Sequence, residues 1–188
     1  MKGYIYTMYQ GADPGNGFTL TDPIYDKEVV TMGACMPNIR RFVDKNDYIF
    51  NISGRVTSLK QYVVGGFQVD KKIDALTALN DYPQNQLKKK DDGTFRGNII
   101  IDSEGNHLDY DYHSNYEKRL DNYILGKDPI FINEEDEIKR AREETLDILK
   151  DIFQKDGDSV FGVIGRFRKM NEKQIDQLIN WMDKIKLK

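Results

Sequence analysis

The sequence predicts an α+β fold, with a β-rich first part followed by two helices. Segments within residues 1–133 alternate their side chains with the period of two that strands show. After residue 133, apolar side chains recur at the spacing of amphipathic helices. Short connections favour a small β-barrel or a strongly bent mixed sheet. We therefore expect residues 1–188 to form a single domain, a β-rich barrel over 1–133 with a helical part over 134–188 packed on it.

Strand signals recur throughout the first part. Tyr4, Tyr6 and Met8 share one side of the opening strand. The segments at 47–53 and 61–70 are rich in β-branched and aromatic residues, and we expect them to pair in antiparallel fashion. The expected strands cover 3–9, 28–34, 47–53, 61–70, 98–102, 107–113 and 128–133. We expect the segments at 3–9, 47–53, 61–70 and 98–102 to share one sheet or barrel.

Helix signals are fewer in the first part and dominate the second. Pro37 can open a short helix, and residues 75–79 suit a helical turn. A charge-rich amphipathic helix is predicted from residue 138 until near Gly157, and residues 160–168 form a turn or short strand. Asn171 with Gln174 indicates the N-cap of a terminal helix. Its apolar stripe consists of Ile175, Leu178, Ile179, Met182 and Ile185.

Composition excludes several classes of protein. Apolar residues are 39% and charged residues 31%, and no apolar run approaches a membrane span, so we expect a globular protein without a membrane partner. A net charge of −3 argues against a globally basic nucleic-acid binder, although a local patch can still bind nucleic acid. The single cysteine, Cys35, excludes an intrachain disulfide and a multi-cysteine zinc site. With no signal-peptide pattern at the N-terminus, we expect a cytoplasmic location.

A candidate ligand site begins at adjacent arginines. Arg40 and Arg41 can hold a phosphate, or they can simply form a solvated face. Asn51 and Ser53 share one face of a strand that ends at Gly54, where they can bond to a base edge or merely turn into solvent. Stacking faces can come from aromatic residues, with Tyr6 of the opening strand as our choice, although aromatic residues at strand spacing also form cores.

A second set of residues suits catalysis. If residues 107–113 are extended, His107, Asp109, Asp111 and His113 share one face. A polar solvent face explains this pattern more simply than a metal ion, so no metal is predicted. His107 and His113 are the only histidines, and acid–base chemistry near neutral pH would use one of them. Cys35 is a candidate nucleophile, with a buried structural cysteine as the alternative.

These residues occur in an order that resembles a known family. Cys35-Met-Pro-Asn-Ile-Arg-Arg41, then Asn46-Asp-Tyr-Ile49, then Tyr62-Val-Val-Gly-Gly-Phe-Gln-Val69 resemble the second type of nucleotide modification associated domain. Asn46 replaces the glycine usual there. The likeness continues weakly to Trp181. The layout also looks like the PUA, ASCH and EVE group of small β-barrels, which implies a PUA-like barrel and binding of RNA or modified bases.

The resemblance implies a binding module for a nucleotide or modified base, associated with the nucleic-acid modification systems of bacteria or phages. The ligand-binding residues would be Arg40, Arg41, Asn51, Ser53, Gly54 and Tyr6. One alternative is an enzyme acting on nucleotides or nucleic-acid bases, with Cys35, Asp111 or His113 in catalysis. Another is a protein-interaction subunit whose helix at 134–155 docks a partner. No Walker, Gly-x-Ser-x-Gly or His-Glu-x-x-His motif is present, and no cofactor is expected.

Overall fold

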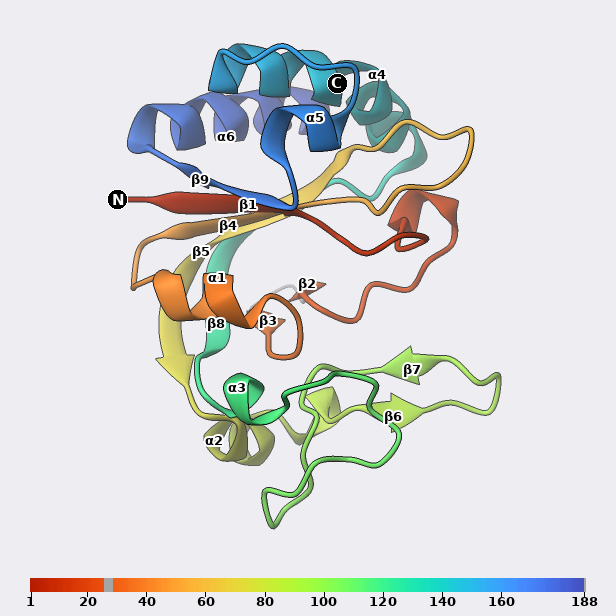
Figure 1. Ribbon diagram of the computed structural model, residues 1–188, viewed down its shortest axis with the longest axis vertical. Coiled ribbons are helices and arrows are strands. Elements are labelled where there is room, and N and C mark those ends of the chain that lie inside the picture. The colour runs from red at the N-terminus through yellow and green to blue at the C-terminus, as the bar shows by residue number, and fades with distance from the viewer. Residues whose placement is uncertain (26–28, 188) are drawn as a thin grey trace. The chain divides into compact units, whose positions relative to one another are not determined.

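The computed structural model describes residues 1–25 and 29–187, and over these residues the protein is an α+β fold. Its larger sheet is mixed and has seven strands in the order β2-β3-β8-β5-β4-β1-β9 (Figure 1). These strands are β1 (Gly3–Thr7), β2 (Ile24–Tyr25), β3 (Val30–Met32), β4 (Tyr48–Ile52), β5 (Val63–Ile73), β8 (Tyr123–Phe131) and β9 (Phe167–Met170). A separate hairpin consists of β6 (Lys88–Lys89) and β7 (Phe95–Arg96).

The sheet does not close into a barrel, so this form of the sequence prediction is wrong. β2 and β9 stand at its two edges. The strand β1 pairs with β4 in parallel and with β9 in antiparallel fashion, which makes the sheet mixed, as the alternative form of the prediction had it. The expected antiparallel pairing of β4 with β5 is confirmed.

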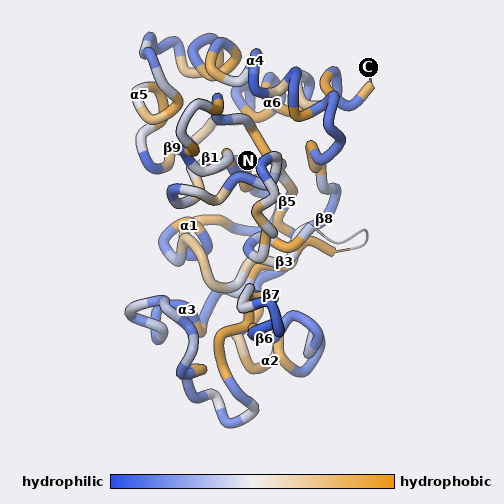
Figure 2. The backbone as a smooth tube through the Cα atoms, turned by 90° about the vertical axis from the view of Figure 1, so that its right-hand side faces the viewer, coloured by the Kyte–Doolittle hydropathy of each residue, from blue (hydrophilic) through white to orange (hydrophobic). Residues whose placement is uncertain are grey.

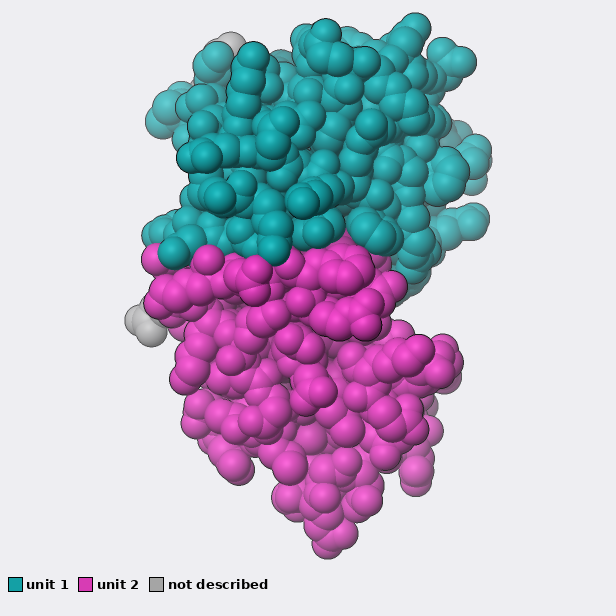
Figure 3. Space-filling model, turned by 60° about the vertical axis from the view of Figure 1, so that its left-hand side comes forward, with its two compact units in different colours: residues 1–19, 46–68, 128–188 teal, residues 20–45, 69–127 magenta. Residues whose placement is uncertain are grey.

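The chain divides into two compact units (Figure 3). Unit 1 comprises residues 1–19, 46–68 and 128–188, and unit 2 comprises residues 20–45 and 69–127. That the whole chain forms one domain, divided at residue 133, stays a prediction. The helices are α1 (Pro37–Phe42), α2 (Ala75–Asp81) and α3 (Glu117–Leu120) in unit 2, and α4 (Glu135–Phe153), α5 (Val160–Ile164) and α6 (Glu172–Lys186) in unit 1.

In unit 1, the two long helices form as the apolar spacing predicts, and they lie side by side (Figure 1). Hydrophobic and hydrophilic residues alternate along α4, as the colours of Figure 2 show. Its buried Thr145 accepts a hydrogen bond of 3.1 Å from the N–H of Val63, which joins the helix to β5. The predicted cap of α6 is confirmed, because Asn171 and Gln174 form a reciprocal capping box.

The apolar stripe of α6 is buried except for Ile179, which is half-buried, and the tryptophan of this helix also has a polar partner. Leu178 is fully buried, and Nε1 of Trp181 donates a hydrogen bond of 2.9 Å to Glu144 on α4. A residue larger than glycine at position 3 would bring its Cβ within 3.0 Å of Ile175, so β1 and α6 are closely packed. Between the long helices, the segment predicted as a turn or short strand contains α5 and then β9.

Unit 2 contains the predicted short helices α1 and α2, but one predicted strand is absent from its part of the larger sheet. Residues 98–102 make only isolated bridges, so the expectation that they join the sheet is wrong. The physical reason is that the run packs between two hydrophobic clusters, which takes the place of pairing in the sheet. Ile99 and Ile101 pack into one hydrophobic cluster, whereas Ile100 packs into another. The predicted strand at 28–34 is β3, and its residue 28 lies outside the described residues.

Candidate active site

In unit 2, Cys35 lies in the bend between β3 and α1. The chain turns sharply after it, since Met36 has a left-handed φ of 48° and Pro37 begins α1. Upstream of this turn, the carboxylate of Asp22 accepts hydrogen bonds from three successive N–H groups, those of Gly33 at 2.9 Å, Ala34 at 3.0 Å and Cys35 itself. The backbone that carries the thiol is therefore held by one buried carboxylate.

The thiol of Cys35 meets a histidine from the distant segment 107–113. Its Sγ lies 3.9 Å from Nε2 of His113. The other ring nitrogen of His113, Nδ1, lies 2.7 Å from Oδ1 of Asp111. The second oxygen of Asp111 lies 2.7 Å from Nε2 of His107, whose ring stacks on Tyr116 with centroids 4.6 Å apart. A nucleophile, a base and an orienting carboxylate thus stand in sequence, and we name Cys35, His113 and Asp111 the thiol relay.

Electrostatics within the thiol relay favour a charged carboxylate and a neutral thiol. Burial raises the pKa of Asp111, but hydrogen bonds from His113 and His107 outweigh it and hold that pKa below its usual value. The Asp111 side chain is only 3% exposed, so its charge acts on the histidines with little screening by water. Burial raises the pKa of the Cys35 thiol, and the negative charge of Asp22 raises it further.

Two arginines oppose the rise in the pKa of the Cys35 thiol. The charges of Arg119 and Arg40 both lower the pKa of the thiol, although burial and Asp22 dominate. Arg119 donates to the carbonyl of Ala34, and Nε of Arg40 donates to the carbonyl of Cys35 at 3.0 Å. The carbonyl groups on either side of the Cys35 side chain are therefore both bound by guanidinium groups.

Asp22 in turn belongs to a buried polar network. The amide of Asn98 donates to Asp22 at 3.1 Å and to the carbonyl of Thr31 at 3.0 Å. The hydroxyl of Tyr123 donates to Oδ1 of Asn98 at 2.7 Å. Burial raises the pKa of Asp22, although the N–H groups of Cys35 and Gly33 and the charge of Arg40 oppose the rise. This network fixes the acceptor that positions the bend before Cys35.

The chain shows no match to any protein-family model, and it has no significant similarity to a curated protein or a solved structure. The likeness to the second nucleotide modification associated domain therefore stays a prediction. Among the described residues, no group of three histidine, cysteine, aspartate or glutamate side chains is placed to hold a metal ion. Within the same residues, none of the helices combines the length and the apolarity that crossing a membrane requires.

The structure places the predicted ligand-binding residues in both units. Arg40 is fully buried in unit 2, where it donates to the carbonyls of Cys35, Asp121 and Asn122. Burial lowers its pKa to about 10, although the charge of Asp22 opposes this. Arg41 is exposed, and its guanidinium lies over the ring of Phe42. Arg40 therefore supports the backbone next to the thiol, whereas Arg41 faces water.

The other four predicted ligand residues belong to unit 1, and all are buried. Tyr6 of β1 stands opposite Asn51 of β4 in the strand register. The hydroxyl of Ser53 accepts a hydrogen bond from the N–H of Tyr62. The N–H of Gly54 donates to the carbonyl of Ala12, and a Cβ at position 54 would lie 1.9 Å from the carbonyl oxygen of Tyr9. Binding of one ligand by these residues together with Arg40 and Arg41 stays a prediction.

The expected alternation of residues 107–113 is wrong, because this segment is not a strand. A turn closes it, with the N–H of Asp111 donating to the carbonyl of Leu108 at 2.9 Å. The turn brings His107 and His113 onto one carboxylate instead of spacing them along a sheet. Sequence reasoning also missed Asp22 and Arg119, which act on backbone N–H and carbonyl groups, and such contacts leave no spacing pattern.

Aromatic side chains of residues 107–113 contact the hairpin β6–β7, which also carries basic side chains. Phe95 stacks on Tyr110 with centroids 6.1 Å apart and meets the edge of Tyr112 at 5.6 Å. Tyr112 is 85% exposed, although it stands between two residues of the thiol relay in sequence. On the two strands of the hairpin, Lys88, Lys89 and Arg96 are basic and exposed. We name these three rings and three basic residues the aromatic–basic surface.

Proposed function

We propose that the protein is a cysteine-dependent enzyme that transfers or hydrolyses an acyl group carried by a nucleotide or nucleic-acid base. The observation that carries this proposal is the thiol relay, with Sγ of Cys35 3.9 Å from Nε2 of His113 and Nδ1 of His113 2.7 Å from Asp111. Cys35 is the nucleophile, His113 is the general base and acid, and Asp111 orients the imidazole.

The attack moves one proton and forms one bond. As Sγ of Cys35 bonds to the carbonyl carbon, the thiol proton passes to Nε2 of His113 and the carbonyl π electrons move to oxygen. The intermediate then expels the leaving group, which takes the proton from His113. Water, deprotonated by His113, hydrolyses the resulting thioester and regenerates the thiol. Asp111 keeps the second proton of the imidazole on Nδ1, so that Nε2 is free to accept.

The raised pKa of Cys35 fits this order of events. A thiol that stays protonated at rest needs its proton removed during attack, which requires a base within reach. His113 is that base, and its side chain is 34% exposed, so a proton can also be exchanged with water. His107 shares Asp111 with the catalytic histidine, but its ring stacks on Tyr116 and its Nε2 is bound to the carboxylate.

The aromatic–basic surface supports a nucleotide or nucleic acid as the substrate carrier. Exposed rings such as Tyr112 offer stacking faces, and stacking on an aromatic side chain is worth about 1–3 kcal/mol per base. Lys88, Lys89 and Arg96 supply positive charge beside these rings. The sequence resemblance points to the same substrate class. We also propose that the strands of the open sheet are arranged in a PUA-like way.

An activated ester tests the reaction without knowledge of the natural acyl group. We expect p-nitrophenyl acetate to release a burst of p-nitrophenol and to leave one acetyl group on the intact protein, measured by mass spectrometry. Because Cys35 is the only cysteine, the variant Cys35→Ser should abolish the thioester adduct and the burst. Absence of both the burst and the adduct in the wild type would contradict the proposal.

The two histidines provide a matched pair of variants. His113→Gln should slow acylation by about 10²- to 10⁴-fold, the usual contribution of a general base. His107→Gln removes a histidine from the same carboxylate and should change the rate by only a few fold. Equal rates for the two variants would show that His113 is not the base, and the thiol relay would then have no catalytic role.

Fluorescent single-stranded oligonucleotides and mononucleotides test the substrate class. Tyr112→Ala should weaken binding, whereas Lys89→Gln should weaken it and also reduce its dependence on salt, because one phosphate contact fewer releases fewer counterions. Exposed Lys173 on α6 provides a charge-matched control, Lys173→Gln. If the wild type binds no nucleic acid and no nucleotide, the substrate class is wrong, while the acylation test still decides the reaction.

A binding module without catalysis is the second candidate, and the exposure of Tyr112 beside basic residues is the observation that favours it. In that case, the wild type and Cys35→Ser would bind a modified base equally well, and neither would acquire an acyl group. Arg41→Ala and Asn51→Ala then test the ligand site that the sequence predicts. A protein-interaction role of the helix at 134–155 also stays a prediction.

A further inference from the structure

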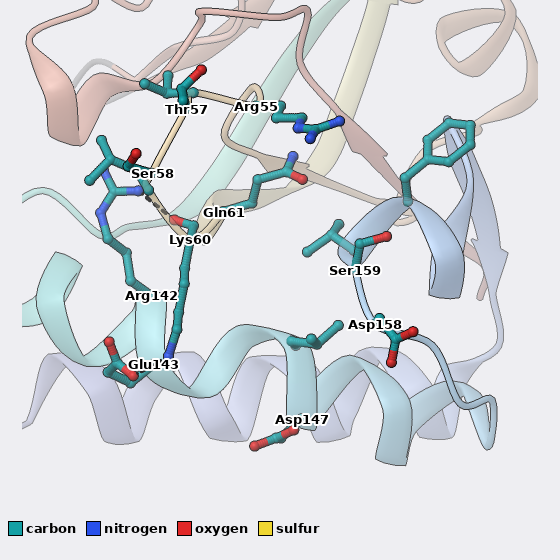
Figure 4. A pocket seen from close by; sticks show the side chains of 15 residues that line it. Arg55, Thr57, Ser58, Lys60, Gln61, Arg142, Glu143, Asp147, Asp158 and Ser159 are labelled. Carbon is teal, nitrogen blue, oxygen red and sulfur yellow. Dashed lines mark hydrogen bonds and ion pairs between the residues drawn. The ribbon is translucent and has the colours of Figure 1, made fainter.

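Two adjoining pockets lie in unit 1, which contributes no residue to the thiol relay. The larger has a volume of about 730 Å³ and is drawn in Figure 4. The smaller has a volume of about 490 Å³. They share four lining residues, which are Arg55, Gln61, Ser159 and Phe161. Because of these shared walls, one molecule can extend from the smaller pocket into the larger.

The smaller pocket carries charge of one sign. Among the residues that the structure describes, Arg55 and Arg166 line it, and no aspartate or glutamate does. The larger pocket carries both signs, since Glu143, Asp147 and Asp158 line it together with three basic residues. A positive pocket next to a balanced one attracts an anion to a defined end of the cavity.

The guanidinium groups of Arg55 and Arg166 are available for a ligand. Over the described part of the chain, neither of them has a hydrogen bond or an ion pair, and both residues are exposed. This distinguishes them from Arg142, which Asp13 neutralises, and from Arg168, which donates to the carbonyl of Val163 at 2.6 Å. Guanidinium groups bind phosphate through two parallel hydrogen bonds, which lysine cannot do.

Neutral groups complete the smaller pocket. Gln61 donates through Nε2 to the carbonyl of Ser53 at 2.7 Å, which fixes its amide at the wall of the pocket. In the view of Figure 4, Arg55 and Gln61 lie at one end of the larger pocket and Asp147 lies at the other. The rings of Tyr9 and Phe161 line the smaller pocket and are 57% and 66% exposed. An anion and a flat or apolar group can therefore be bound side by side.

We propose that this pair of pockets binds a small organic phosphate monoester, with its phosphate on Arg55 and Arg166 and its organic part against Tyr9 and Phe161. The hydroxyl or amino groups of the ligand extend toward the larger pocket, where Asp147 and Asp158 can accept hydrogen bonds. This site is separate from the thiol relay in its residues and its chemistry, and it does not depend on the proposed acyl transfer.

Calorimetric titration of the full chain tests the site with defined molecules. The titrants are inorganic phosphate, ribose 5-phosphate, AMP and adenosine. We expect AMP to bind most tightly, ribose 5-phosphate and inorganic phosphate to bind more weakly, and adenosine to bind least. Arg55→Gln and Arg166→Gln should each raise the dissociation constant of AMP by about 10- to 100-fold, the effect of losing a hydrogen bond to a charged group.

Further variants allow the proposal to be refuted. Lys173→Gln removes one positive charge from α6 and should leave the dissociation constant of AMP unchanged. Phe161→Ala should weaken AMP binding more than ribose 5-phosphate binding. The proposal is overturned if no phosphate ligand binds, if adenosine binds as tightly as AMP, if inorganic phosphate binds as tightly as AMP, or if the arginine variants behave like Lys173→Gln. Because mononucleotides can also bind at the aromatic–basic surface, the pocket site is assigned to the AMP binding that Arg55→Gln weakens and that Tyr112→Ala leaves unchanged.

Discussion

His113 and Asp111 are separated by one residue in the chain, yet Nδ1 of the histidine lies 2.7 Å from Oδ1 of the aspartate. In a strand, residues two apart are spaced by about 6.6–6.8 Å, and their side chains stand parallel without this contact. The turn at Leu108 to Asp111 makes the contact possible, and the N–H of His113 also donates to the same carboxylate at 3.2 Å. Asp111 therefore fixes both the backbone and the ring of His113.

This arrangement leads to the first prediction, that Asp111→Asn slows the acylation of Cys35. An asparagine retains one acceptor and adds a donor, so it cannot hold His113 and His107 in their present tautomers. We expect acylation by p-nitrophenyl acetate to fall by about 10²- to 10⁴-fold. Asp109→Asn is the matched control, because Asp109 is exposed and lies outside the relay. A burst rate that is equal in both variants would refute the role of Asp111.

The second prediction concerns alkylation of Cys35 as a function of pH. Since burial and Asp22 raise the pKa of the thiol, the thiolate fraction should still be rising at pH 9, above the usual thiol pKa of about 8.5. The iodoacetamide rate should therefore increase with pH without a plateau in this range. Arg119→Gln should slow alkylation at every pH, because it removes a charge that lowers the thiol pKa. Lys118→Gln removes the neighbouring charge and should have little effect, and a plateau below pH 8 would contradict the prediction.

Much of the fold can be predicted from the sequence. This holds where side chains recur with a regular spacing and where the interacting residue or strand is near in the chain. The helices α4 and α6 follow from apolar spacing, and the cap of α6 follows from Asn171 and Gln174. The pairing of β4 with β5 follows from two strand-like runs with a short connection. Closure into a barrel has no such local determinant. The run of three isoleucines at 99–101 is equally compatible with a buried strand and with a segment between two clusters, as observed.

The candidate site could be predicted by residue type but not by arrangement. Cys35 and His113 are the residues that thiol chemistry requires, yet they are separated by 78 positions, and only the fold brings them to 3.9 Å. The sequence pattern indicated Arg40 as a phosphate ligand, whereas the structure buries it against backbone carbonyls. Asp22 gave no signal, because a carboxylate that binds N–H groups of a bend has no characteristic spacing from them.

The third prediction concerns the stripe of α6. Leu178 is fully buried, so Leu178→Ala should lower the free energy of unfolding by about 2–5 kcal/mol through lost burial and a residual cavity. The adjacent Gln177 is exposed, and Gln177→Ala should change the free energy of unfolding by less than about 0.5 kcal/mol. Urea denaturation followed by tryptophan fluorescence is suitable, because Trp181 lies about one turn further along the same helix. An unchanged midpoint for Leu178→Ala would show that the stripe does not pack in solution.

The last prediction concerns Asp22, whose carboxylate holds the bend before the thiol. The variant Asp22→Asn keeps one acceptor oxygen, so some of the N–H groups of Gly33, Ala34 and Cys35 lose their partner. Each buried donor left unpaired costs about 1–3 kcal/mol, and we expect a loss of stability in that range together with slower acylation by Cys35. Gln177→Ala again serves as the reference for a neutral substitution.

The pH dependence of that loss has a defined sign. Burial raises the pKa of Asp22 in the folded state above its unfolded value of about 3.9, so the folded state holds the proton more tightly. Its contribution to stability is complete below about pH 4 and is lost as the pH rises through the folded pKa. The amide introduced by Asp22→Asn cannot ionise, so the difference in unfolding free energy between wild type and variant should be largest near pH 4 and should shrink as the pH increases. Urea midpoints at successive pH values measure this difference, and a gap that widens with pH would mean that Asp22 is more readily ionised in the folded chain than in the unfolded one.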